Sequence, residues 1–161
     1  MRFRTELSYD AAPDAVFAML SDRAYREKVL EARAEVVSYE VSLELSGAGF
    51  TLVTHQVQDT AGLPSIAKKF AGDTTQAVVT ETWKDGSGAT VEIVAPGKPT
   101  KTTGTLSLKA AGSGTVEVVD LDVKVKVPLI GGKLEALVVA EIESGYAAEQ
   151  RVGTAWLAGE R

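Results

Sequence analysis

The 161-residue chain contains no cysteine, no asparagine and only one histidine. Without cysteine the chain can form no disulfide, no thiolate metal site and no cysteine nucleophile. The missing asparagine removes N-glycosylation, and His55 alone lacks the further nitrogen or sulfur ligands that a zinc site requires. We therefore expect neither a structural disulfide nor a bound metal.

The chain also lacks an excess of basic charge and any long apolar run. Its 17 Lys and Arg residues are outnumbered by 22 Asp and Glu, for a net charge of −5, whereas nucleic-acid binding requires a basic surface. No run reaches the roughly 18 apolar residues of a membrane span. Met1–Glu6 meets an acid before any apolar stretch, unlike a signal peptide. We predict a cytoplasmic protein with no nucleic-acid partner and no integral membrane segment.

Sequence motifs for cofactors and nucleophiles are missing as well. Gly131–Lys133 resembles a phosphate-binding loop only superficially, because it lacks the P-loop spacing and the Ser or Thr after the lysine. No nucleophile-elbow pattern is present. We expect no cofactor, and the sequence assigns no catalytic residue.

The beginning of the chain predicts one strand followed by two short helices. Arg2–Tyr9 alternates apolar and polar residues, which is typical of a half-buried strand. Asp10–Asp14 carries helix-start signals, with Pro13 in the first turn. This helix is interrupted at Ser21–Asp22, and a second short helix is expected over Arg23–Ala34.

Period-two patterns then mark six further strands separated by turn sequences. These strands are expected over Glu35–Leu45, Phe50–Gln58, Thr74–Lys84, Ala89–Ala95, Thr102–Ala110 and Thr115–Val127. Pro128 ends the last strand, because proline cannot donate a hydrogen bond to the ladder. A long helical pattern follows from Lys133 to about Leu157.

These elements predict an α+β fold in which a curved, seven-stranded antiparallel sheet grips a long C-terminal helix. Strands joined by tight turns must be antiparallel, and one face of such a sheet must be covered. A helix of about 25 residues is roughly 37 Å long, and seven strands about 4.8 Å apart span roughly 29 Å. The helix can therefore cross the whole sheet, and we predict one domain over residues 1–161.

The predicted geometry leaves space between the sheet and the helix. A helix about 10–12 Å across cannot touch a wide curved sheet everywhere. Aromatic residues make up only 6% of the chain, and the inward strand positions are mostly Val and Ala. We hypothesise an apolar cavity there, the usual form of a small-molecule site; a packed core of small side chains is the alternative.

The order of elements resembles the helix-grip fold of the START and Bet v 1-like superfamily. The resemblance is carried by the opening strand with the segment DAAPDAVFAMLSD (Asp10–Asp22), which is similar to that family's "aspxxvwxxlxD" helix. The junction VKVPLIGGKLE (Val125–Glu135) is similar to DUF2505, an actinobacterial family of unknown function. The likeness covers essentially the whole chain. It implies an apolar pocket, in a family that ranges from lipid and hormone binders to polyketide cyclases, but no shared catalytic residue.

Several strand residues are candidates for the pocket. His55 can serve as a polar anchor or proton carrier if its strand face turns inward, but the opposite face carries Phe50 and Leu52, so the orientation stays open. Glu81 shares a face with Val79, and inside a cavity its carboxyl would have a raised pKa and act as an acid, a base or a ligand for a hydroxyl.

The alternative for Glu81 is a solvated position beyond the covered part of the sheet. Trp83 and Tyr39 are similarly placed to line the pocket, and core packing explains each equally well. The irregular segment Asp59–Gly72, which contains Phe70, is either a lid over the pocket or a plain surface connection.

The C-terminal helix contributes a second set of candidates. Glu141 falls near the inward stripe of Val138 and Ile142, and Gly145 removes bulk from the same side. A mid-helix glycine costs about 1 kcal/mol relative to alanine, which a nearby strand or ligand would explain. Tyr146 is expected to place its hydroxyl at the pocket border.

The sequence favours binding or transport of a hydrophobic small molecule, either a lipid or a polyketide-like compound. An enzyme of the cyclase or dehydratase type, with Glu81 or His55 as acid or base, is one alternative, and a protein-interaction module is another. The oligomeric state stays open between a monomer and a weak dimer.

Overall fold

The computed structural model describes residues 1–161 and contains the predicted elements in the predicted order. The strands are β1 (Arg2–Tyr9), β2 (Val36–Ser46), β3 (Gly49–Asp59), β4 (Thr74–Asp85), β5 (Gly88–Val94), β6 (Thr100–Ala111) and β7 (Gly114–Val125). The helices are α1 (Pro13–Leu20), α2 (Arg23–Glu31), α3 (Ser65–Ala71) and α4 (Gly131–Leu157). Helix α2 ends at Glu31, earlier than the predicted Ala34.

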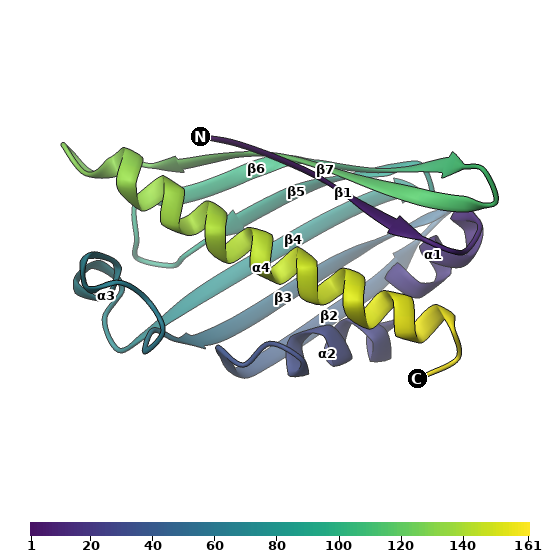
Figure 1. The fold of residues 1–161 in the computed structure, drawn as a ribbon, viewed down its shortest axis with the longest axis horizontal. Helices are drawn as coiled ribbons and strands as arrows, with labels where there is room; N and C mark the ends of the chain where they lie inside the picture. The colour runs from purple at the N-terminus through teal and green to yellow at the C-terminus, as the bar shows by residue number, and fades with distance from the viewer.

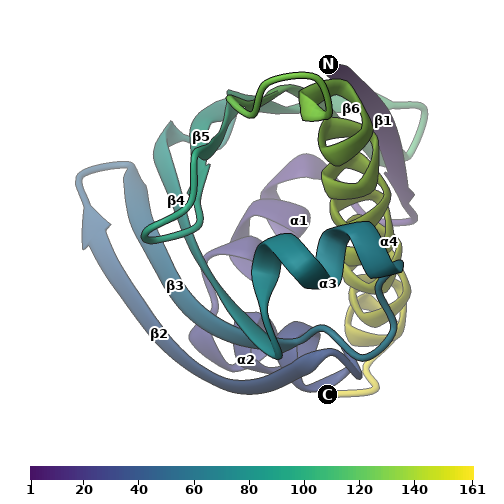
Figure 2. The same cartoon turned by 90° about the vertical axis from the view of Figure 1, so that its left-hand side faces the viewer.

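All seven strands form one antiparallel sheet in the order β1-β7-β6-β5-β4-β3-β2. The first strand therefore pairs with the last, with Phe3 opposite Leu121, and every other neighbouring pair is consecutive in the chain. Figure 1 shows α4 lying across the sheet, and Figure 2 shows the sheet curling around it. The predicted architecture is confirmed. No helix in the structure combines the length and the hydropathy needed to cross a membrane.

Helix α1 lies at the end of the sheet opposite α3, and α2 follows it beside β2 and α4 (Figure 1). Pro13 begins α1 with a φ angle already suited to a helix. The carboxylate of Asp22 begins α2 by accepting a hydrogen bond of 2.9 Å from the backbone N–H of Ala24. The buried hydroxyl of Tyr25 then donates to the backbone carbonyl of Glu149 at 3.0 Å, which ties α2 to α4.

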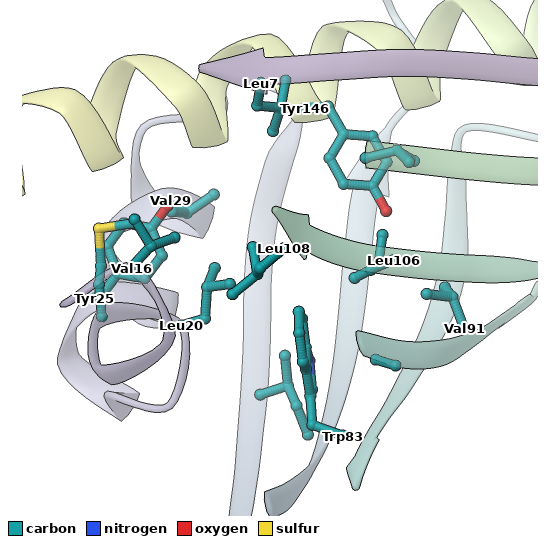
Figure 3. Close-up of a cluster of buried hydrophobic side chains, with 14 of the residues drawn as sticks. Leu7, Val16, Leu20, Tyr25, Val29, Trp83, Val91, Leu106, Leu108 and Tyr146 are labelled. Carbon is teal, nitrogen blue, oxygen red and sulfur yellow. The ribbon is translucent and has the colours of Figure 1, made fainter. Parts of the chain in front are cut away.

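The hydrophobic core is concentrated at this same end. The rings of Phe17, Phe50 and Trp83 lie with centroids 5.6 to 5.8 Å apart, and Tyr25 packs edge-on against Trp156 at 5.6 Å. Figure 3 shows how side chains from α1, α2, α4 and the sheet meet in this core. Most of the few large aromatic side chains therefore pack at one end of the sheet.

Two glycines on the inward side of α4 meet different surroundings. A Cβ on Gly153 would lie 2.8 Å from Cε1 of Tyr9 and 3.0 Å from the hydroxyl of Tyr25, closer than ordinary contact. A Cβ on Gly145 would lie 3.5 Å from the Cζ atom of Arg33, which is ordinary van der Waals contact. Close approach of α4 to the core thus requires glycine at 153 and not at 145.

We predict opposite effects when each glycine is replaced by alanine. Gly145→Ala is expected to raise the free energy of unfolding by about 1 kcal/mol, because alanine favours the helix. Gly153→Ala is expected to lower it by about 1–3 kcal/mol, because the added methyl overpacks the contact with Tyr9 and Tyr25. Urea denaturation of both variants measures the two values. A Gly153→Ala variant as stable as the parent would contradict the tight approach of α4.

Candidate functional site

A cavity of about 260 Å³ lies between the sheet and α4, away from the aromatic core. Of its 33 lining residues, 18 are hydrophobic, so the wall is mainly apolar with polar groups at defined places. The α4 part of the wall extends from Leu134 to Glu149, which at 1.5 Å per residue is about 22 Å of helix. Residues of α2 line one end and residues of α3 the other.

The two ends of the cavity differ in exposure. The inner end is formed by buried residues beside α2, namely Arg26, Leu52, Glu81, Tyr146 and Glu149. The outer end is formed by partly exposed residues beside α3, namely Leu63, Phe70, Lys98, Leu137 and Glu141. Figure 2 looks at the molecule from the outer end. The cavity is therefore more exposed beside α3 and more enclosed beside α2.

Most of the residues predicted from the sequence lie on the cavity wall. These are Phe70, Val79, Glu81, Val138, Glu141, Ile142, Gly145 and Tyr146. They come from α3, β4 and α4, and the fold brings them together around one space. That they bind a ligand stays a prediction.

Three predicted residues lie elsewhere. His55 is exposed on the outer face of β3, because Phe50 and Leu52 occupy the inner face of that strand. Trp83 is buried in the aromatic core, beyond the cavity. The hydroxyl of Tyr39 donates a 2.6 Å hydrogen bond to Glu31 of α2 at the outer edge strand β2. None of the three side chains lines the cavity.

A buried ion pair forms the floor of the inner end. Two guanidinium nitrogens of Arg26 donate to the two carboxylate oxygens of Glu81 at 3.1 and 2.8 Å, and both side chains are 6% exposed. The Nε of Arg26 donates to the carbonyl of Leu20 at 2.7 Å, and the indole N–H of Trp83 donates to Glu81 at 2.8 Å. Glu81 thus points inward as one prediction had it, but both its oxygens are already occupied.

Glu149 is the acidic residue of the inner end that has no partner in the chain. Its side chain lines the cavity and is 8% exposed, and its carboxyl takes part in no hydrogen bond or ion pair of the chain. Burial raises its pKa to about 7; Glu81 adds to this rise, whereas Arg26 and Arg33 oppose it. Glu149 therefore changes its charge near neutral pH, with a carboxyl that faces the cavity.

Tyr146 lies one helical turn before Glu149, on the same side of α4. Figure 3 shows its ring reaching from α4 toward the sheet near Leu106. The hydroxyl has no partner within the chain, and burial raises its pKa well above the usual value, so it stays protonated. Tyr146 and Glu149 together give the inner end two unoccupied hydrogen-bonding groups.

A second buried acid lies behind the cavity wall. Glu117 of β7 is completely buried, and neither carboxylate oxygen has a partner; the hydroxyl of Tyr9 is also unpartnered. Burial raises the pKa of Glu117 well above its usual value, and the nearby acids Glu149 and Glu81 raise it further. Glu117 is therefore held as a neutral acid in the core.

Sequence reasoning missed Arg26, Glu117 and Glu149. For Glu117 a signal existed, because it lies on the same face of β7 as the inward Val119 and Leu121. For Glu149 the signal was its spacing from Ile142 and Tyr146 along the inward side of α4. Neither signal is decisive, because charged residues in an amphipathic pattern normally face solvent.

The outer end is partly fixed by polar contacts. Lys98 donates to the carbonyl of Phe70 at 3.0 Å and lies 5.7 Å from the centre of its ring, which attaches α3 to the β5–β6 connection. On the side wall, Arg33 donates to Glu35 at 2.8 Å and to the amide oxygen of Gln56 at 3.1 Å. Whether α3 acts as a lid stays a prediction.

Comparisons with known proteins agree with this architecture. The family model described as "Protein of unknown function (DUF2505)" matches residues 4–157. No curated protein matches the chain. The structure is similar to those of START and Bet v 1-like helix-grip proteins.

Three solved structures illustrate the likeness. TTHA0849 from Thermus thermophilus is 21% identical, with 96% of this chain and 98% of that chain covered and a TM-score of 0.68. A START superfamily protein from Mycobacterium smegmatis is 17% identical, with 94% and 96% covered and a TM-score of 0.60. The di-domain ARO/CYC StfQ from the steffimycin biosynthetic pathway is 14% identical with a TM-score of 0.68, and the match covers 98% of this chain and 50% of that chain. At these identities the likenesses show the fold.

We predict that Arg26 and Glu81 depend on each other for stability. Arg26→Met is expected to lower the free energy of unfolding by about 3–5 kcal/mol, because it leaves the Glu81 carboxylate buried without its cation. The double variant Arg26→Met/Glu81→Met is expected to recover most of this loss, apart from about 1 kcal/mol for the lost acceptor of Trp83. Urea denaturation of the single and double variants gives the coupling energy. A double variant that loses the sum of both single losses would contradict the pairing.

We also predict that Glu117 makes the fold less stable as the pH rises. The folded state holds the proton of Glu117 more tightly than the unfolded state, so this group favours folding most below its unfolded pKa. Its contribution then declines by about 1.4 kcal/mol per pH unit until the folded pKa is reached. Glu117→Gln is expected to flatten the loss of stability between pH 5 and pH 8.

The matched control is Glu44→Gln on the exposed face of β2. It is expected to leave the pH dependence of unfolding unchanged. Unfolding free energies of the three proteins at pH 5, 6, 7 and 8 provide the comparison. If Glu117→Gln keeps the slope of the parent, Glu117 is not a buried neutral acid.

Proposed function

The chain belongs to the DUF2505 family of proteins of unknown function, and we propose that it binds a small hydrophobic molecule in the cavity between its sheet and α4. The observation that carries this proposal is the cavity itself, with its mainly hydrophobic wall. A concave, largely apolar space with a few convergent polar groups is the usual form of a small-molecule site. The fold alone is weak support for the proposed ligand binding, because one fold supports many functions.

The size and shape of the cavity support a slender ligand of modest volume. At about 260 Å³ it lies near the lower end of ordinary ligand pockets, which range over about 300–1,000 Å³. Its wall nevertheless follows about four turns of α4. We infer a lipid-like chain or a small polyketide-like compound, and the likeness to an ARO/CYC protein of a biosynthetic pathway supports the second kind.

A second candidate function is catalysis in the same cavity. Glu149 supports it, because a buried carboxyl with a pKa of about 7 that faces a cavity has the properties of a general acid or base. Glu81 and His55, the acids and bases suggested by the sequence, do not fill this role, since one is paired with Arg26 and the other faces solvent. Conversion of a bound compound by the parent and not by Glu149→Gln would favour the enzyme over the carrier.

Two broader features stay predictions from the sequence. We propose that residues 1–161 act as one helix-grip domain, and that the protein works in the cytoplasm. The pairing of β1 with β7, the first and last strands in the chain, supports the first of these.

We predict that the cavity takes up the neutral apolar dye N-phenyl-1-naphthylamine, with a rise in fluorescence. Val138→Trp fills the cavity from α4 and is expected to weaken dye binding at least tenfold, about 1.4 kcal/mol. Ala140→Trp, on the exposed side of the same helix and outside the wall, is the matched control and is expected to bind like the parent. Absence of dye uptake by the parent, or equal binding by both tryptophan variants, would contradict a ligand site in this cavity.

A further inference from the structure

At the inner end of the cavity the cationic side chains are paired, but one acidic side chain is not. Arg26, the cation there, is balanced by the bidentate carboxylate of Glu81. On the side wall, Arg33 is paired with Glu35. The acid Glu149, in contrast, has no cationic partner of its own. The inner end therefore has no cation left to balance a further negative charge.

The unoccupied polar groups at the inner end come from one face of α4. Glu149 is more than nine-tenths buried, lines the cavity and forms no hydrogen bond through its carboxyl. Tyr146 lines the same space, is 9% exposed, and its hydroxyl has no partner in the chain. Both groups face the cavity, so a ligand oxygen can form hydrogen bonds with them in place of solvent.

From this arrangement we propose that the inner end binds an uncharged oxygen of the ligand, a carbonyl or a hydroxyl, between Glu149 and Tyr146. The site would therefore select ketones and alcohols over carboxylates of equal chain length. This inference rests on the proposed binding function and narrows its ligand class, because it removes free fatty acids from the lipids considered.

The protonation of the inner end supports this choice. Burial raises the pKa of Glu149 to about 7, so the carboxyl is protonated in mildly acidic solution and donates a hydrogen bond to a carbonyl. A ligand carboxylate would instead bring its charge into a buried end where Arg26 is already paired with Glu81. Burying a charge without a partner is costly.

Charged and titratable groups from several elements surround Glu149. They are Tyr9 of β1, Tyr25 and Arg26 of α2, Arg33 after α2, Glu81 of β4, Glu117 of β7 and Tyr146 of α4. Burial raises the pKa of each of the three tyrosines, and none of them ionises near neutral pH. Burial also raises the pKa of Glu117, so this residue provides the necessary control.

The outer end offers one competing arrangement. Lys98 lines the cavity beside Phe70 and has no carboxylate partner. A carboxylate ligand could contact Lys98 with its head group, but its apolar tail would then meet the unpartnered groups of the inner end. We therefore expect such binding to be weak.

The test compares three ligands with the same ten-carbon chain: 2-decanone, decanoate and decylamine. Displacement of N-phenyl-1-naphthylamine from the full-length protein at pH 6 measures the affinity for each ligand. We expect 2-decanone to bind at least tenfold more tightly than decanoate and more tightly than decylamine. Binding of decanoate or decylamine as tight as that of the ketone would overturn the proposal. Failure of the dye itself to bind would overturn the underlying binding function instead.

Variants of Glu149 assign the effect to this residue. Glu149→Gln keeps a hydrogen-bond donor and is expected to bind 2-decanone within about threefold of the parent at pH 6, whereas Glu149→Leu loses at least tenfold, about 1.4 kcal/mol. Both should still bind the dye, which shows that they are folded. Equal ketone binding by Glu149→Leu and the parent would exclude a contact with Glu149.

The pH dependence gives an independent readout. Between pH 6 and pH 8.5 Glu149 loses its proton and its ability to donate, so the affinity of the parent for 2-decanone is expected to fall. The affinity of Glu149→Gln should stay constant over this range, and that of Glu117→Gln should fall as in the parent. A pH dependence that persists in Glu149→Gln and disappears in Glu117→Gln would overturn the assignment.

Discussion

The buried ion pair between Arg26 and Glu81 is the interaction on which the inner half of this structure depends. It joins α2 to β4, the two elements that close the cavity at its inner end. A buried pair of this kind is weak evidence for net stability, because removing two charges from water is costly. What the pair does provide is geometry: it fixes the depth at which the cavity stops and occupies the one cation found there.

The cavity follows from how the few large side chains are distributed. Most aromatic contacts lie at the α1–α2 end, where Phe17, Phe50 and Trp83 fill the space between sheet and helices. Toward the N-terminal part of α4, the sheet presents smaller side chains such as Ala77 and Val79, which leave space below the helix. The same helix therefore closes a core at one end and covers a cavity at the other. Gly153 allows the close approach, and Gly145 lies where the space has already opened.

The fold could be predicted from the sequence because each element carries its own local signal. Period-two alternation, the turn residues and the stripe of α4 together determine the sheet, its covered face and the crossing helix. The orientation of β3 could not be predicted, because both of its faces carry apolar residues: Phe50 and Leu52 on one, Val53 and Val57 on the other. Only pairing with β2 and β4 in the curved sheet decides that His55 faces outward.

The polar residues of the site were harder to predict than its apolar wall. Val138, Ile142 and Tyr146 follow the hydrophobic stripe, so their position on the cavity was accessible from spacing alone. Arg26, Glu117 and Glu149 lie inside because a three-dimensional partner or an enclosed space exists for them, and spacing alone assigns charged residues to solvent. Their burial is also what gives the cavity its chemistry, since Glu149 would be an ordinary surface acid on the other side of α4.

The most direct test of the central claim is native mass spectrometry of the purified protein, followed by solvent extraction and identification of any retained compound. We expect a complex heavier than the chain by the mass of one small apolar compound, which carries a carbonyl or hydroxyl and no carboxylate. It also predicts that Val138→Trp purifies without this compound. A bare chain that takes up none of a panel of ketones, alcohols and polyketide-like compounds would contradict the claim that the cavity is a ligand site.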